Sequence, residues 1–220
     1  MSRAVVFDLW NTLAVWPEED SRVFRHRWSA LLGVTPEDLD EVWYAPGVYT
    51  RRETGPIADA LTSVHASFGV IAEVSDVVEW RLDIARRALV PDAEVVATLK
   101  ELRRRGIATG LISNCTEEVA LVWDETPFAA LFDAAIFSAT ARCMKPEREI
   151  YELALAELGI SASDALFVGD GANDELPGAQ RVGMTPILLL PDGNEPRWDG
   201  VRDWSGLRVA SIPDVLSLIV

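Results

Sequence analysis

The pattern of hydrophobic and polar positions divides the chain into three stretches. The first is a short apolar run from Ala4 to Phe7, which stops at a carboxylate and predicts a buried strand. Between residues 14 and 90, apolar residues recur at helical spacing and no run is typical of a strand. From Pro91 onward, short apolar runs alternate with amphipathic segments. This alternation predicts a parallel sheet covered by helices.

The middle stretch is predicted to form four helices. They are expected over residues 21–32, 36–44, 57–68 and 75–89. The second helix has a well-defined start, because Thr35 can cap it and Pro36 suits its first position. We expect a break at residues 45–47, which include adjacent Pro and Gly, and a polar turn over residues 51–56.

The third stretch is predicted to add five strands and five helices. The expected strands are 107–112, 134–137, 165–168, 186–190 and 207–211, and the expected helices are 93–105, 117–123, 147–158, 175–182 and 213–219. Glycine directly follows three of these helices, as it does at many helix ends. The whole chain is therefore expected to be an α/β protein with one parallel sheet.

Composition narrows the possible partners. The 220 residues include 20 Lys and Arg but 35 Asp and Glu, which gives a formal net charge of −15 at pH 7. A field of this sign repels nucleic acids and anionic lipids, so neither nucleic acid nor a membrane is an expected partner. It also repels anionic substrates at long range. Any phosphate site must therefore be built locally, from a metal ion, a lysine and backbone amides.

Cysteine content and the N-terminal sequence indicate a compartment. The two cysteines, Cys115 and Cys143, suggest a reducing environment and no disulfide framework. The chain enters its first strand without a charged and apolar leader, and no apolar run is long enough to cross a bilayer. We therefore expect a cytoplasmic protein. The sequence leaves monomer and homodimer open.

Chemically active groups follow several predicted strands. Asp8 ends the first strand, Ser113 and Asn114 end the second, and Asp170 ends the strand at 165–168. Ligands of open α/β sheets bind beyond the carboxyl ends of the strands, so we expect these residues near one another. Lys145 precedes another predicted helix. Taken singly, such residues can simply cap a turn or a helix, and a lysine is usually solvated.

Together and in this order, these groups resemble the four motifs of the haloacid dehalogenase-like (HAD) hydrolase superfamily. The resemblance rests on Asp8, Ser113-Asn114, Lys145-Pro146 and the segment Gly169–Asp174, within residues 3–13 and about 91–190. It implies a Rossmann-like core formed by residues 1–13 and 91–220. It also implies that residues 14–90 form a helical cap, although a helical subdomain with no part in the site would show the same pattern.

The resemblance implies a role for the residues that would meet the substrate. Asp8 matches the nucleophile, which forms an aspartyl intermediate in this family. Ser113 and Asn114 match residues that donate hydrogen bonds to a phosphate oxygen. Lys145 matches the lysine that stabilises charge on the phosphoryl group.

Mg²⁺ is the cofactor that the resemblance implies. Its ligands would be the carboxylates of Asp8 and Asp170 and the backbone carbonyl of Trp10. Asp174 would hold a metal-bound water or the glycine-rich loop. An acidic turn that leads into a helix is the plainer interpretation of Asp170 and Asp174.

Trp10 departs from the pattern of most phosphatases of the superfamily. These have a second Asp two residues after the nucleophile, which protonates the leaving oxygen and later activates water. An indole N–H only donates a hydrogen bond and cannot exchange a proton at neutral pH. Haloacid dehalogenases also carry an aromatic residue there. They need no metal, however, and have a sequence similar to Ser-Ser-Asn at the position of Gly169-Asp170-Gly171.

The metal carboxylate therefore favours a Mg²⁺-dependent phosphatase that acts on a small phosphorylated metabolite. Two alternatives stay open: a 2-haloacid dehalogenase-type hydrolase and a non-catalytic regulatory or binding protein of HAD type. Arg51 and Arg52 of the predicted cap can contact a substrate or be solvated. Tyr151 matches a dehalogenase spacing, but a place on the apolar face of its helix is the plainer interpretation.

Overall fold

A computed structural model describes residues 3–219. Its centre is a six-stranded parallel sheet in the order β3-β2-β1-β4-β5-β6. The strands are β1 (Ala4–Phe7), β2 (Ala108–Ser113), β3 (Ala134–Phe137), β4 (Ala165–Gly169), β5 (Thr185–Leu189) and β6 (Leu207–Val209). The predicted Rossmann-like α/β fold is confirmed, and the first strand lies in the middle of the sheet.

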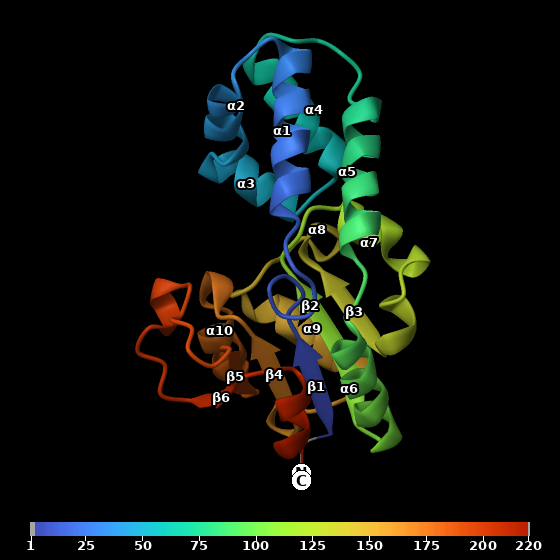
Figure 1. Cartoon of the computed structure of the whole chain (residues 1–220), viewed down its shortest axis with the longest axis vertical. Coiled ribbons are helices and arrows are strands. Elements are labelled where there is room, and N and C mark those ends of the chain that lie inside the picture. The colour runs from blue at the N-terminus through green and yellow to red at the C-terminus, as the bar shows by residue number, and fades with distance from the viewer. Residues whose placement is uncertain (1–2, 220) are drawn as a thin grey trace.

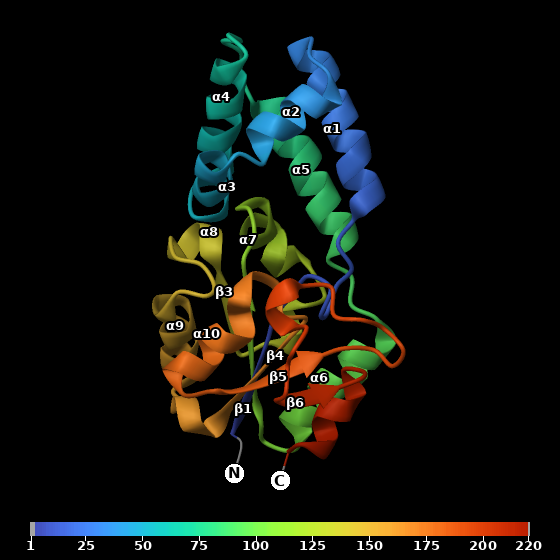
Figure 2. The same cartoon turned by 90° about the vertical axis from the view of Figure 1, so that its left-hand side faces the viewer.

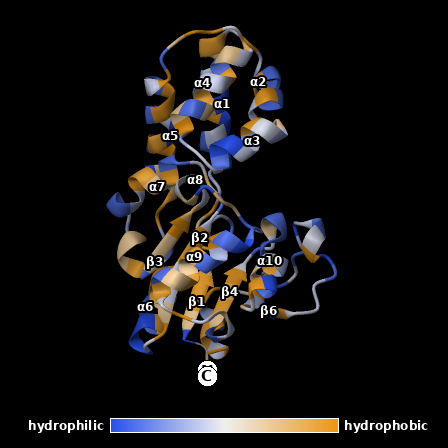
Figure 3. Cartoon of the chain, turned by 180° about the vertical axis from the view of Figure 1, so that it is seen from behind, coloured by the Kyte–Doolittle hydropathy of each residue, from blue (hydrophilic) through white to orange (hydrophobic). Residues whose placement is uncertain are grey.

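Helices cover both faces of this sheet (Figure 1). The helices of this part are α6 (Ala93–Arg104), α7 (Glu118–Val122), α8 (Ser138–Ala141), α9 (Arg148–Leu158) and α10 (Glu175–Val182). Val5 and Phe7 pack into the core on one face, while Ala4 and Val6 pack into the core on the other. All four are fully buried, which explains why β1 reads as a continuous apolar run. Figure 3 shows the same apolar character along the central strands.

A separate group of helices stands beyond the carboxyl ends of the strands (Figures 1 and 2). These are α1 (Glu18–Leu32), α2 (Pro36–Trp43), α3 (Pro46–Glu53), α4 (Ile57–Ser67) and α5 (Ser75–Ala88). They have a hydrophobic core of their own, with Trp28 fully buried at its centre. The Trp28 indole N–H donates a hydrogen bond of 3.0 Å to Nε2 of the buried His65.

The helix that begins at Pro36 ends at Trp43, so a break occurs close to the expected position, but a further helix begins at once with Pro46. The polar turn expected at 51–56 is wrong over residues 51–53, which belong to α3, and Pro46 suits the first turn of this helix because its missing N–H has no cost there. The expected C-terminal helix at 213–219 is the short 3₁₀ helix Pro213–Ser217. The Thr35 prediction is confirmed: its hydroxyl accepts a hydrogen bond from the Asp38 backbone N–H at the start of α2.

Candidate active site

The register of the three central strands brings the predicted site residues together. Phe7 pairs with Leu111 of β2 on one side and with Val168 of β4 on the other. Asp8, which follows Phe7, is therefore flanked by the ends of both neighbouring strands. Its side chain is buried, and the Thr12 hydroxyl donates a 3.0 Å hydrogen bond to its Oδ2 atom. The nucleophile candidate thus has a fixed orientation.

Lys145 is the centre of the site. Its ammonium donates to Oδ1 of Asp8 at 2.5 Å and to Oε2 of Glu175 at 2.6 Å. The lysine is 2% exposed. Burial opposes its charge, but the attraction of Asp8 and Glu175 outweighs that effect and raises the pKa of Lys145. The lysine therefore stays protonated as a fixed cation between two carboxylates.

Asn114 holds the backbone of Lys145 from both sides. Its amide N–H donates to the Lys145 carbonyl at 2.9 Å, and its side-chain oxygen accepts from the Lys145 N–H at 2.7 Å. Ser113, at the end of β2, is fully buried, and its hydroxyl is 3.5 Å from the Asn114 carbonyl. In this structure Asn114 positions the lysine, a function that sequence analysis did not assign to it.

Three carboxylates converge around Lys145. Asp8, Asp170 and Glu175 each offer an oxygen, and these oxygens lie within 4.8 Å of one another. Burial and the charge of Asp8 raise the pKa of Asp170, and burial raises the pKa of Glu175. With all groups ionised, three negative charges face one positive charge. The surplus of two charges, carried by oxygen ligands, fits a hard divalent cation such as Mg²⁺.

Glu175 takes the inward place that sequence analysis gave to Asp174. Asp174 is exposed and precedes α10 with a φ of 51°. Glu175 is fully buried, and its Oε1 accepts from the Gly171 N–H at 2.9 Å. A Cβ atom on Gly169 would lie 2.1 Å from that oxygen, so Glu175 requires glycine there. Residues 174 and 175 are both acidic, so the sequence alone does not show which of them points into the site. The structure distinguishes them because only Glu175 is buried.

Trp10 projects from the loop after β1 and packs edge-on against Trp16, with ring centroids 5.1 Å apart. Its indole nitrogen is buried and has no hydrogen-bond partner among residues 3–219. None of these contacts makes Trp10 a proton donor for the reaction. Its exposed surface instead faces a cavity.

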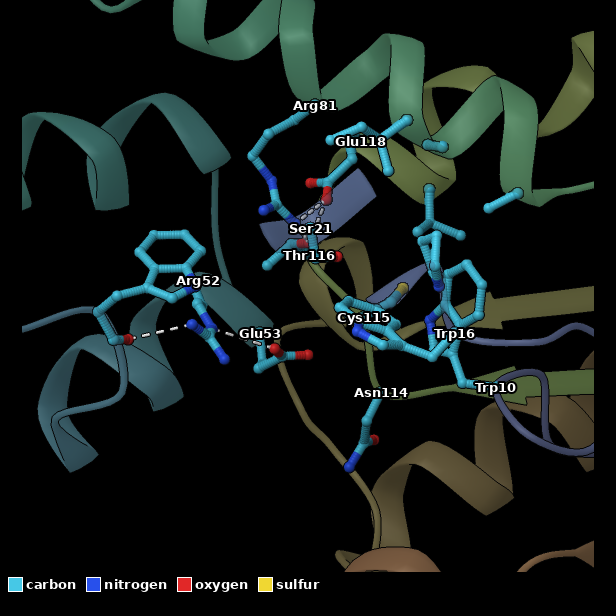
Figure 4. A pocket seen from close by; sticks show the side chains of 16 residues that line it. Trp10, Trp16, Ser21, Arg52, Glu53, Arg81, Asn114, Cys115, Thr116 and Glu118 are labelled. Atoms are coloured by element: carbon cyan, nitrogen blue, oxygen red, sulfur yellow. Dashed lines mark hydrogen bonds and ion pairs between the residues drawn. The ribbon is translucent and has the colours of Figure 1, made fainter. Parts of the chain in front are cut away.

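This cavity of about 60 Å³ lies beside the Asp8–Lys145 site, between the helices α1–α5 and the loops of the sheet (Figure 4). Trp10 and Asn114 line it, whereas Asp8 and Lys145 do not. Of the two arginines predicted for substrate contact, the buried Arg52 lines the cavity and the exposed Arg51 does not. The other charged lining residues, Glu53, Arg81 and Glu118, could not be predicted from the sequence, because they come from three separate helices or helix ends.

Tyr151 contacts the backbone of Glu175 from helix α9. Its hydroxyl donates to the Glu175 carbonyl at 2.8 Å, and the residue is fully buried on α9. Cys115 is also buried, and burial raises the pKa of its thiol. Tyr151 therefore lies on the apolar face of its helix, as expected from the sequence, and Cys115 belongs to the hydrophobic core.

Comparison with known proteins identifies the relatives of this chain. The family model described as haloacid dehalogenase-like hydrolase matches residues 2–183. A ribulose-1,5-bisphosphate 5-phosphatase from Halopiger xanaduensis is 27% identical over 208 residues, which are 87% of this chain and 86% of that protein. (S)-2-haloacid dehalogenase 4A from Burkholderia cepacia is 25% identical over 206 residues, or 90% and 87% of the two chains.

Solved structures divide in the same way. A HAD phosphatase from Thermococcus onnurineus matches with a TM-score of 0.73 at 20% identity, over 100% of this chain and 98% of that one. A 2-haloacid dehalogenase from Pseudomonas syringae pv. Tomato matches with a TM-score of 0.74 at 23% identity and the same coverage. These structures share the fold. Within residues 3–219, no helix is both long and apolar enough to cross a membrane.

The burial difference between Glu175 and Asp174 generates a stability prediction. Glu175→Gln removes one of the two carboxylates that neutralise buried Lys145, so it should lower the unfolding free energy by about 3 kcal/mol. Asp174→Asn is the matched control, because it makes the same chemical change on an exposed residue and asparagine tolerates a positive φ. It should cost less than about 0.5 kcal/mol. Equal losses in denaturant titrations of the two variants would contradict this account of the cluster.

Proposed function

The chain belongs to the haloacid dehalogenase-like hydrolases, and within this family we propose that it is a Mg²⁺-dependent phosphatase for a small phosphorylated metabolite. One observation carries the proposal: Asp170 and Glu175 stand beside Asp8 and leave a negative surplus around Lys145. An enzyme that needs no metal has no use for such a surplus, whose carboxylates repel one another and the substrate. A divalent cation offsets that repulsion.

The proposed reaction has two displacements at phosphorus. An Asp8 oxygen attacks the phosphoryl group, the bond from phosphorus to the ester oxygen breaks, and the leaving group departs with that oxygen. Water then attacks phosphorus, the Asp8–phosphorus bond breaks, and inorganic phosphate leaves. Thr12 and Lys145 hold the carboxylate in position through their hydrogen bonds to its two oxygens. Lys145, held in turn by Asn114, offsets charge on the transferring group.

The metal would be held by Asp8, Asp170 and the Trp10 carbonyl, and when bound it would neutralise the phosphoryl oxygens. Asp170 is already oriented for this task. The Trp198 indole N–H donates to one of its oxygens at 2.9 Å, and the Ala172 N–H donates to the other at 3.0 Å. Ser113 would bind a phosphoryl oxygen. The helices α1–α5 would act as the cap over this site.

Contacts across that boundary support the cap proposal. The Ile57 N–H at the start of α4 donates to Glu117 at 2.9 Å, and Arg81 of α5 donates to the Thr116 hydroxyl at 2.8 Å. Arg81 also pairs with Glu118 of α7. The cap thus reaches the loop that follows β2, where Ser113 and Asn114 lie.

A haloacid dehalogenase is the second candidate, and Trp10 favours it. The carboxylate surplus argues against it. A haloacid is itself an anion, so without a metal its charge would add to that of the carboxylates already in the site. A regulatory protein with a degenerate site is the third candidate. The intact contacts of Asp8, Lys145 and Asp170 argue against degeneration.

Product analysis separates these three functions. Wild-type protein should release phosphate from small aryl or acyl phosphates with Mg²⁺, and EDTA or the variants Asp8→Asn and Asp170→Ala should abolish that release. Chloride release from 2-chloropropionate without metal would instead establish the dehalogenase. Phosphate release that survives Asp8→Asn would exclude an aspartyl mechanism, and no turnover of either substrate would favour the regulatory protein.

The unusual residue Trp10 generates a second prediction. A general acid contributes roughly 10²–10⁴-fold, and an indole cannot supply it. An alkoxide leaving group needs that proton, whereas a phenolate or carboxylate does not. The wild type should therefore turn over aryl and acyl phosphates far better than alkyl phosphates, with kcat/KM falling steeply as leaving-group pKa rises.

Two matched variants isolate the carboxyl group. Trp10→Asp should raise kcat/KM for alkyl phosphates preferentially, while Trp10→Asn, which opens the same space without an acid, should not. Both leave the backbone carbonyl in place for the metal. A flat dependence on leaving-group pKa in the wild type would show that another group supplies the proton.

A further inference from the structure

The connection between β5 and β6, residues 190–206, packs against the loop that carries Asp170. It contains the short 3₁₀ helix Asp199–Val201 and runs beside the start of α10, as the orange-to-red part of Figure 1 shows. Most of this β5–β6 connection is exposed, and Val201 is its one buried residue. The connection lies beyond residue 183, where the match to the family model ends. The family match therefore assigns it no role.

Trp198 joins the β5–β6 connection to the site through a side-chain hydrogen bond. Its indole N–H donates to Oδ2 of Asp170 at 2.9 Å, and the Ala172 N–H donates to Oδ1 at 3.0 Å. The Ala172 bond is local, because it spans two residues, whereas the Trp198 bond spans 28 residues. A carboxylate held at both oxygens cannot rotate without losing one of these bonds. The orientation of Asp170 thus depends on a segment that is distant in the chain.

Two close contacts hold the connection against the same loop. A Cβ atom on Gly171 would lie 2.6 Å from a methyl carbon of Val201, so no larger residue fits there without a shift. A Cβ atom on Gly200 would lie 2.6 Å from Oδ1 of Asp174. The connection and the loop after β4 are therefore packed together, and the Trp198–Asp170 bond lies between them.

We propose that Trp198 is a positioning residue for the metal site, and that it holds Asp170 in the orientation in which its carboxylate faces the ion beside Asp8. The proposal rests on the proposed Mg²⁺-dependent function, because it assigns a role at the same site. In this structure the oxygens of Asp8, Asp170 and Glu175 lie within 4.8 Å of one another while Trp198 holds Asp170. A carboxylate without that bond would sample other rotamers and would lose this freedom only when the ion binds.

The coupling must also act in the opposite direction. If the docked connection raises the affinity for the ion, the ion favours the docked connection by the same factor. Trypsin can report this effect, because Arg197 and Arg202 stand on either side of the 3₁₀ helix and of Trp198, and their side chains are 56% and 69% exposed. Metal binding should therefore protect both positions from cleavage.

Metal affinity tests the role of Trp198 without turnover. Mn²⁺ is the probe, because it prefers the same carboxylate and water ligands as Mg²⁺ and its free-ion electron paramagnetic resonance signal falls on binding. Trp198→Phe keeps an aromatic ring but removes the N–H. Groups that hydrogen-bond to a metal ligand typically change metal affinity by 10–100-fold, so the Kd for Mn²⁺ should rise about tenfold.

Trp204→Phe is the matched control. It makes the same chemical change in the same connection, but the Trp204 N–H donates to the Leu207 carbonyl at 3.0 Å. Its Kd for Mn²⁺ should equal that of the wild type. Val201→Ala is a second variant, which leaves the Trp198 N–H in place and loosens the packing of the connection on Gly171, and it should also raise the Kd. Wild-type affinity in both Trp198→Phe and Val201→Ala would overturn the proposal.

Proteolysis gives a readout that separates this proposal from the phosphatase proposal. Saturating Mn²⁺ should slow cleavage after Arg197 and Arg202 about tenfold more in wild-type and Trp204→Phe protein than in Trp198→Phe protein, because the two effects share one coupling factor. Equal protection in all three proteins would overturn the role of Trp198 and leave the phosphatase intact.

Two further outcomes concern the proposed function. The expected order of Mn²⁺ affinities in a protein that releases no phosphate would retain the role of Trp198 and reject the phosphatase. Wild-type protein that binds no Mn²⁺ at all would reject the metal site and both proposals with it.

Discussion

The structure depends on one buried cation. Lys145 is almost entirely buried, and a lone ammonium in that position would be strongly unfavourable. Asp8 and Glu175 make it possible, and they arrive from the end of β1 and the start of α10. Asn114 at the end of β2 fixes the lysine backbone, and Gly169 at the end of β4 leaves room for Glu175. Three strands and one helix are therefore positioned by a single ion-pair cluster.

The same cluster explains the chemistry that we propose. With Asp8, Asp170 and Glu175 all ionised, two negative charges remain after Lys145 is neutralised, and a cation favours that ionised state; the whole chain carries a formal charge of −15. A local site of this kind can hold a phosphoryl group that the global field repels. The cavity under α1–α5 has the opposite design. Its charges cancel within the buried pairs Arg52–Glu53 and Arg81–Glu118.

Much of this arrangement could be predicted from the sequence, since it follows from strand ends. Asp8, Asn114 and Asp170 end apolar runs, and parallel strands bring such ends to one edge of the sheet. Residues placed by helix faces were harder to predict. Asp174 and Glu175 are adjacent acids at a helix start, and Arg51 and Arg52 are adjacent cations at a helix end. Helix α3 itself was missed because Pro46 can end one helix or begin the next. Only tertiary packing decides which member of each pair points inward.

The most direct test of the account is to locate the phosphoryl group during turnover. Wild-type protein is mixed with Mg²⁺ and an aryl phosphate, quenched with acid, and analysed by peptide mass spectrometry. Since Trp10 cannot activate water, the covalent intermediate should accumulate, and the phosphoryl group should be found on the peptide that contains Asp8. The adduct should be absent from Asp8→Asn protein. Phosphate release with no adduct, or with an adduct on another residue, would contradict the assignment of Asp8 as the nucleophile.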